Sequence, residues 1–268
     1  MMRLCRVWAI VLRQIYLIRA SFSRLLPLFI WVAVDIVLWG FLTRYLNSFD
    51  LAGFNFISVM LGAVLLWDIF IRIMQGVTMA FFEDVWARNF LNIFSTPILV
   101  SEYLAGLVCS SIVTSFIGIV VMFFLALFVF GFSFLSYGVV IVPFLFVLFL
   151  FGIALGVAAS ALVLRLGPAA EWFIWPIPAI ISPFVGVLYP VAVLPEWMRI
   201  VSLILPPSYV FESFRAVISG QPADGVALFS GCALAVFYMF LSCWFFTRTY
   251  HHARRTGLIA RYSAESLS

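Results

Sequence analysis

Residues 139–164 read VVIVPFLFVLFLFGIALGVAASALVL and contain no charged side chain. A run of about 20 apolar residues is long enough for one helix to cross the hydrocarbon core of a bilayer. Residues 165–168, Arg-Leu-Gly-Pro, break the pattern. The sequence therefore predicts a membrane-spanning helix here. Gly152, Gly156 and Ser160 follow one another at four-residue spacing, which allows another helix to pack closely.

Apolar runs of the same kind lie on both sides of this segment. We expect six spans in all, at residues 27–46, 56–80, within 99–130, 139–164, 172–189 and 226–247. The fifth run is interrupted by Pro176, Pro178 and Pro183. The sequence therefore predicts an all-α membrane protein, with residues 27–247 forming one bundle of six transmembrane helices.

The composition of the whole chain supports a membrane protein. Its 268 residues have a mean hydropathy of +1.21 and only 10% charged residues, whereas a soluble domain usually has about 25%. All 15 basic residues are arginine, so the chain has no lysine. A P-loop needs a lysine on the nucleotide phosphates, and a Schiff base needs a lysine amine. ATP binding through a P-loop and Schiff-base chemistry are therefore excluded.

Arginine placement predicts the orientation of the spans. Arginines cluster before the first span and after the last, and two more lie in loops on the same side: Arg3, Arg6, Arg13, Arg19, Arg24, Arg88, Arg165, Arg248, Arg254, Arg255 and Arg261. The opposite side has only Arg199 and Arg215. We therefore expect both termini to be cytoplasmic, in a protein of the plasma (inner) membrane, with residues 248–268 as a cytoplasmic tail.

Residues 1–26 show the pattern of an amphipathic helix. At about 100° per residue, Arg6, Arg13 and Arg24 share one face. The apolar residues of the opposite face are Leu4, Val11, Ile15, Ile18 and Phe22, with Trp8 beside them. We expect this helix to lie in the membrane plane. The alternative is an ordinary positively charged flank that happens to be helical.

Residues that could hold a metal or start covalent chemistry are scarce. The four cysteines form no Cys-x-x-Cys pair, and we interpret them as small buried apolar residues. His251 and His252 are adjacent, so on a helix they point about 100° apart and cannot hold one metal together. We expect no catalytic site, no metal and no cofactor bound by this chain.

Residues 81–102, FFEDVWARNFLNIFSTPILVSE, follow the second span. Glu83 and Asp84 come first, and Thr96-Pro97 ends a short helical pattern. A simple linker would not keep aromatic residues such as Trp86 and Phe90 in water. We expect this segment to dock, either into lipid headgroups or onto a partner protein.

Residues 190–225 form a mixed segment that is too interrupted to span the membrane. Two short helical patterns flank Pro206-Pro207, and Glu212 precedes Arg215 by three residues, a spacing at which the two can pair. The segment remains rich in apolar residues, so it predicts a broken, re-entrant hairpin. Such a backbone is tolerated only where protein or water satisfies its polar groups.

Three charged residues lie inside predicted spans: Asp35 in the first, and Asp68 and Arg72 in the second. A charge at the centre of a membrane helix costs about 2.5–3.5 kcal/mol on insertion scales, so partners are expected. Asp68 and Arg72 are four residues apart and can pair within one helix. Asp35 and Arg72 fall at similar depth in neighbouring spans, and we predict that these two pair. The charges serve either structure or the passage of a substrate.

The two interrupted segments together resemble the permease subunit of a type-2 ABC transporter, over almost the full length of the chain. Glu83-Asp84, Arg88 and Thr96-Pro97 are similar to that family's coupling segment, although Asn89 stands where many members have glycine or a second charge. The more specific match is in residues 190–225, whose matching positions include Pro195, Trp197, Pro206, Pro207, Tyr209, Glu212 and Arg215.

This resemblance implies an N-terminal connecting helix, a cytoplasmic coupling helix after the second span and short re-entrant helices before the sixth. It implies an assembly of two permeases, as a homodimer through the first and fifth spans, with separate ATPase subunits that use the ATP. The cargo would be an exported amphiphile such as a drug, a lipid or a lipid-linked polysaccharide. The residues implied in contact with the ATPase are Glu83, Asp84, Trp86, Arg88, Asn89, Phe90, Thr96 and Pro97.

Two other functions remain open at this stage. One is an ion-coupled secondary transporter working through Asp35 and Asp68. The other is a membrane-embedded lipid-modifying enzyme, for which Glu196, Glu212 and Arg215 are the only polar cluster at the outer face. In each case the expected surroundings are membrane lipids, and we expect no nucleic acid as a partner.

Overall fold

The computed structural model describes residues 4–19, 22–48, 57–87, 89–132, 138–167 and 170–257. Within these ranges the regular structure is helical and no strand is present. The helices are α1 (Leu4–Arg19), α2 (Phe22–Asn47), α3 (Gly62–Trp86), α4 (Phe90–Ser95), α5 (Val100–Phe130), α6 (Ile141–Leu166), α7 (Glu171–Ile174), α8 (Ile177–Val185), α9 (Glu196–Leu203), α10 (Pro206–Ile218) and α11 (Gly225–Thr256).

In the described part of the chain, four helices are long and apolar enough to cross a membrane. They are Val59–Trp86, Val100–Phe130, Gly138–Leu166 and Gly225–Thr256. These four coincide with the predicted second, third, fourth and sixth spans, so the prediction of long apolar helices there is confirmed. The predicted first span, residues 27–46, lies inside the 26-residue helix α2. Several α2 side chains lie outside the described residues, and α2 is not one of these four.

The predicted fifth span, residues 172–189, is not a single long helix. It is divided into α7 and α8, with Trp175 and Pro176 between them, and α8 ends at Gly186, whose φ is +69°. The two pieces run from Glu171 to Val185, which at 1.5 Å per residue covers about 22 Å of the roughly 30 Å hydrocarbon core. Prolines cause the break, since a proline ring cannot continue the helical hydrogen-bond pattern.

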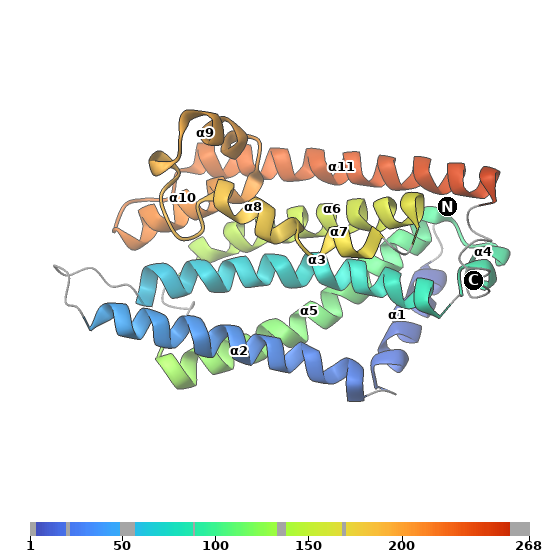
Figure 1. The fold of residues 1–268 in the computed structure, drawn as a ribbon, viewed down its shortest axis with the longest axis horizontal. Coiled ribbons are helices and arrows are strands. Elements are labelled where there is room, and N and C mark those ends of the chain that lie inside the picture. The colour runs from blue at the N-terminus through green and yellow to red at the C-terminus, as the bar shows by residue number, and fades with distance from the viewer. Residues whose placement is uncertain are drawn as a thin grey trace.

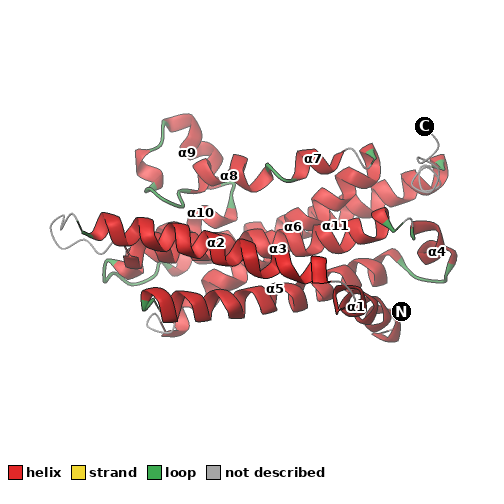
Figure 2. Cartoon of the chain, turned by 60° about the horizontal axis from the view of Figure 1, so that its bottom comes forward, coloured by secondary structure: helices red, strands yellow, loops and turns green. Residues whose placement is uncertain are grey.

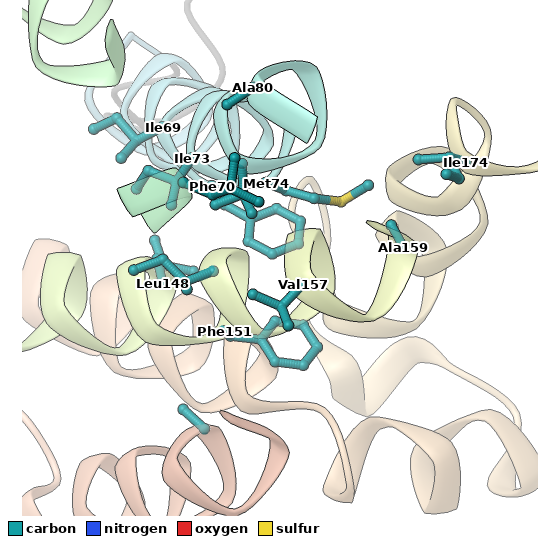
Figure 3. Close-up of a cluster of buried hydrophobic side chains, with 14 of the residues drawn as sticks. Ile69, Phe70, Ile73, Met74, Ala80, Leu148, Phe151, Val157, Ala159 and Ile174 are labelled. Carbon is teal, nitrogen blue, oxygen red and sulfur yellow. The ribbon is translucent and has the colours of Figure 1, made fainter. Parts of the chain in front are cut away.

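The long helices pack around α3 and α6. α3 lies between α5 and α6, and α11 covers the other side of α6 (Figures 1 and 2). Small residues permit the α3–α6 contact, as predicted: a Cβ atom on Gly156 would stand 2.8 Å from the carbonyl oxygen of Met74. Around this contact the side chains form the apolar core, in which the rings of Phe70 and Phe151 stack at 5.6 Å (Figure 3).

The two ends of the bundle differ in how the chain interrupts its helices. One end, called here the α4 end, holds α1, α4 and the last turns of α11 (Figure 1). The opposite end, called the α9 end, holds α9 and α10. The first and last described helices therefore reach the same end, in line with the predicted common side for both termini. Which side of the membrane that is stays a prediction.

Candidate functional site

A short helix, α4, follows α3, the helix at the predicted second span, as expected from the sequence. α4 has only six residues and lies between the end of α3 and the start of α5. Thr96 leaves the helical region with φ −83° and ψ 160°, because the residue before a proline disfavours helical backbone. The segment therefore joins two long helices through a separate, sharply bounded element.

The apolar face of α4 packs into the bundle. Phe90 is fully buried, and its ring stands 5.3 Å from that of Phe81 on α3. Phe94 contacts Tyr103 of α5 at 5.1 Å and Tyr250 of α11 at 4.7 Å. The expectation that these aromatic residues dock onto lipid or a partner is therefore wrong for Phe90, because its own bundle provides the site.

Asp84 is also directed inwards. It is almost completely buried, forms an ion pair with Arg13 of α1, and accepts a 2.7 Å hydrogen bond from the hydroxyl of Tyr103. Both carboxylate oxygens are thus occupied within the chain. The predicted contact of Asp84 with an ATPase is corrected by this geometry, since a buried carboxylate is held where partners compensate its lost hydration.

A second buried acid ties α1 to α5. Glu102 is fully buried, pairs with Arg6 at 3.2 Å, and accepts a 3.0 Å hydrogen bond from the backbone N–H of Leu99 at the start of α5. Nearby, the Gln14 amide donates to the carbonyl of Ala80 at 3.0 Å. α1 is therefore fixed to the ends of α3 and α5 by specific polar contacts.

The predicted faces of α1 need correction for the same reason. The periodicity places Arg6 and Arg13 on the polar face of a helix in the membrane plane, whereas the structure pairs them with the acids of α5 and α3. Val11, assigned to the lipid face, is 1% exposed, whereas Leu4 is 77% and Trp8 59% exposed. The periodicity identified the helix correctly, but it could not identify the buried carboxylates that attract the arginines.

After Phe90, the described exposed residues of the α4 segment are mainly polar, with Pro97 and Leu99 as the apolar ones. Asn92, Ser95, Thr96 and Pro97 are exposed, and these four residues are called the α4 face below. Trp86 is 48% exposed, stacks on Phe82 at 5.5 Å and donates to Glu171 of α7 at 3.3 Å. Of the other predicted contact residues, Glu83 and Asn89 are half-buried, and Arg88 lies outside the described residues.

The charges inside the spans pair within one helix. Arg72 binds the same oxygen of Asp68 through Nη2 at 2.8 Å and Nε at 3.1 Å. Within the described part of the chain this is the only ion pair of Arg72, so the predicted Asp35–Arg72 pair is wrong. Four-residue spacing on a helix brings two side chains together without help from a neighbour. Asp35 on α2 remains half-buried, within electrostatic range of both.

The α9 end confirms a broken element before α11. α9 and α10 are bent by 101° relative to each other, and α10 begins with Pro206 and Pro207. The predicted Glu212–Arg215 pair is present at 2.7 Å. Two other residues of the predicted signature lie nearby: Pro195 directly precedes α9, and Trp197 is exposed.

The Glu212–Arg215 pair also binds backbone groups. Glu212 accepts from the N–H of Val191 at 2.7 Å, while Arg215 donates to the carbonyls of Gly186 and Val187. The pair thereby holds the end of α8 and the turn that follows it. This use of both side chains in the fold leaves them poorly suited to the catalytic role considered for a lipid-modifying enzyme.

Sequence reasoning missed the tyrosines that complete both ends. Tyr103 and Tyr250 hold α4, and Tyr238 of α11 donates to the carbonyl of Ile204 at 3.1 Å. A tyrosine inside an apolar run was the available signal, since a buried hydroxyl normally finds a hydrogen-bond partner.

In the part of the chain that the structure describes, no three His, Cys, Asp or Glu side chains gather to hold a metal ion. Compared with known proteins, the chain matches no protein-family model and no curated protein. The function is therefore argued from the geometry of the two ends and of the spans.

Proposed function

We propose that this chain is the permease subunit of an ATP-driven transporter of the type-2 ABC class, powered by a separate ATPase subunit. The observation that carries the proposal is the seating of α4. One face of this short helix packs into the bundle, while the α4 face is exposed and, apart from Pro97, polar. A linker that only joined two spans would need no such seat.

The contacts of α4 explain how force on it would reach the membrane. Phe90 packs against α3, and Phe94 packs against both α5 and α11. Close-packed interiors transmit displacement because they have few voids. A push on the α4 face would therefore move three long helices together, which is what coupling ATP hydrolysis to transport requires.

The proposal includes six membrane crossings with both termini in the cytoplasm. α2 supplies the first crossing, and α7 with α8 supplies the fifth as a short, broken span. The cargo is an exported amphiphile, because the many apolar and aromatic side chains of the bundle suit loose binding of such molecules.

The proposal also includes a homodimer, in which two copies of the chain pair through α2 and through α7–α8. Large apolar side chains are exposed on both elements: Val34, Leu38 and Phe41 on α2, and Trp172, Phe173 and Ile180 on α7–α8. Pairs of single cysteines on these elements, in a background without native cysteines, are expected to cross-link between two copies. Finding only monomers in the assembled transporter would contradict the dimer.

The test of the coupling role is a charge placed on the α4 face. Ser95→Arg adds a bulky charge at an exposed serine whose hydroxyl bonds only the carbonyl of Asn92, at 2.9 Å. Ser219→Arg is the matched control, because Ser219 is also exposed and bonds the carbonyl of Arg215 at 2.9 Å, but at the α9 end. We expect both variants to insert normally, and only Ser95→Arg to lose ATPase co-purification or transport-stimulated ATP hydrolysis. If both variants keep, or both lose, ATPase co-purification and transport-stimulated ATP hydrolysis, α4 has no coupling role.

An ion-coupled secondary transporter is the second candidate, and Asp35 is the observation that favours it. This half-buried carboxylate lies inside α2 without an ion pair to any described residue. Loss of ion-gradient-driven transport in Asp35→Asn, without any need for ATP, would establish this second function in place of the first.

A further inference from the structure

The break between α9 and α10 lies against α11 on an exposed face of the bundle, where Leu203 is 61% and Ile204 54% exposed. α10 crosses α11 closely at Gly231, where an added Cβ atom would stand 3.1 Å from the Cβ of Tyr209. Further along α11, Tyr238 reaches the carbonyl of Ile204, the residue that ends α9. Gly231 and Tyr238 lie about 9 and 20 Å from the first residue of α11 at 1.5 Å per residue. The break therefore sits well below the start of a membrane-spanning helix.

A helix end at this depth leaves carbonyl groups without helical partners, and hydrocarbon offers them none. In this structure the carbonyls of Ser202 and Leu205 accept backbone N–H groups at 3.1 Å, and hydroxyl groups supply further hydrogen bonds. The Ser208 hydroxyl lies 2.6 Å from the carbonyl oxygen of Ser202 and 2.7 Å from that of Leu205, so its one hydrogen is shared between them. Tyr209 donates to the carbonyl of Leu203 at 2.8 Å.

The fourth carbonyl of the break, that of Ile204, accepts its hydrogen bond from a different helix. Ser208 and Tyr209 belong to α10, so their bonds stay within the broken element, whereas the donor to Ile204 comes from Tyr238 on α11. The N-terminal side of the break needs fewer partners, because Pro206 and Pro207 have no N–H groups to satisfy. Among the described residues, the Tyr238 hydroxyl thus makes the one side-chain hydrogen bond between the tip of the hairpin, residues 202–208, and the span beside it.

We propose that α9 and α10 form a latched re-entrant element, and that Tyr238 is the positioning residue that holds its tip closed against α11. Gly231 provides the seat on which α10 rests. At the side away from the tip, called the shallow side, the element is fixed separately by the hydrogen bonds that Arg215 donates to the carbonyls of Gly186 and Val187. Release of Tyr238 frees the tip while the shallow side stays in place, so the hairpin opens about its outer end. The inference stands apart from the proposed function, since it concerns the position of the tip alone.

Hydrogen exchange of the full-length chain in lipid nanodiscs tests the latch. Tyr238→Phe keeps the ring and removes the hydroxyl. We expect exchange in peptides covering residues 196–208 to rise about three- to tenfold, the range that the loss of one hydrogen bond permits. Tyr189→Phe is the matched control, because Tyr189 donates to the carbonyl of Pro183 at 2.8 Å, away from the tip. Its effect is expected near α8 only.

A distance measurement separates an opened tip from general loosening. Spin labels at Ile204 and Leu166, both exposed, report the separation of the tip from the far end of α6. The distribution is expected to broaden in Tyr238→Phe and in Gly231→Ala, and to stay unchanged in Tyr189→Phe. If Tyr238→Phe leaves both the exchange and the distance unchanged, or if Tyr189→Phe alters the tip equally, Tyr238 is not a latch.

Discussion

Helices are interrupted at both ends of the bundle, but the polar groups at the two interruptions are paired by different kinds of side chain. At the α4 end, Arg13 pairs with Asp84 and Arg6 pairs with Glu102, so charges on α1 meet buried carboxylates on α3 and α5. At the tip of the α9–α10 hairpin, the carbonyls receive hydrogen bonds from neutral groups, namely hydroxyls and, for Ser202 and Leu205, backbone N–H groups as well.

The difference follows from the cost of charge in each place. The acids of the α4 end lie in the last turn of α3 and the first turn of α5, where arginine side chains can still reach water. The tip of the α9–α10 hairpin lies deeper along a membrane helix, where an ionised group costs several kcal/mol. Neutral donors avoid that cost, but each contributes only about 0.5–1.5 kcal/mol. The α4 end is therefore expected to be rigid, and the tip of the α9–α10 hairpin to open more readily.

The largest expected effect comes from breaking a pair at the α4 end. Arg13→Ala leaves the Asp84 carboxylate buried without its cation, which should lower the free energy of unfolding by about 3–5 kcal/mol. Unfolding of the purified chain in detergent measures the change. Arg19→Ala is the control, because Arg19 is exposed at the end of the same helix and should cost less than about 0.5 kcal/mol. Equal losses of unfolding free energy in the two variants would show that the Arg13–Asp84 ion pair stabilises the fold no more than an exposed arginine does.

The second-largest effect is expected from breaking the Asp68–Arg72 pair inside α3. Arg72→Met leaves Asp68 alone within α3, and we expect a loss of about 2.5–3.5 kcal/mol. Removing both charges, by Arg72→Met with Asp68→Leu, should restore a large part of it. Asp35→Asn should have a small effect, since the structure gives Asp35 no share in the pair. A loss in Asp35→Asn as large as in Arg72→Met would restore the Asp35–Arg72 pair that the sequence favoured.

At the α9–α10 hairpin, Ser208→Ala should cost about 0.5–1.5 kcal/mol, because the carbonyls of Ser202 and Leu205 lose the hydroxyl they share while each keeps its backbone N–H donor. Ser230→Ala serves for comparison, since Ser230 bonds only the carbonyl of Val226 in its own helix. Thermal unfolding in the same detergent gives both values. A cost for Ser208→Ala no greater than for Ser230→Ala would mean that the backbone N–H groups alone satisfy these two carbonyls.

The smallest effect is expected for Trp86→Phe. This change keeps an aromatic ring on Phe82 and removes only the 3.3 Å hydrogen bond to Glu171, at an exposed position. The free energy of unfolding should change by less than about 0.5 kcal/mol. A larger loss would show that α7 depends on Trp86, and that the α4 end is braced from outside as well as from within.

Sequence reasoning predicted the elements better than their contacts. Apolar runs located the four long helices, and Thr96-Pro97 and Pro206-Pro207 marked the two interruptions, because chain-breaking residues act locally. The Glu212–Arg215 pair also followed from local spacing. Asp84 and Phe90 were assigned to a docking surface because their partners, Arg13 and Phe81 among them, come from other helices. The prolines of the fifth run also marked an interruption, but they did not show which of them would divide the helix, and the structure places the division at Trp175 and Pro176.

The central claim, that a separate ATPase acts on this chain through α4, is tested most directly by site-specific cross-linking in the native membrane. A photoreactive residue is placed at Ser95 on the α4 face and, for comparison, at Ser219 at the α9 end. We predict a covalent adduct between position 95 and a polypeptide that contains an ATP-binding site, and no such adduct from position 219. The claim is contradicted if position 95 yields no adduct with an ATP-binding polypeptide, or if the two positions yield the same one.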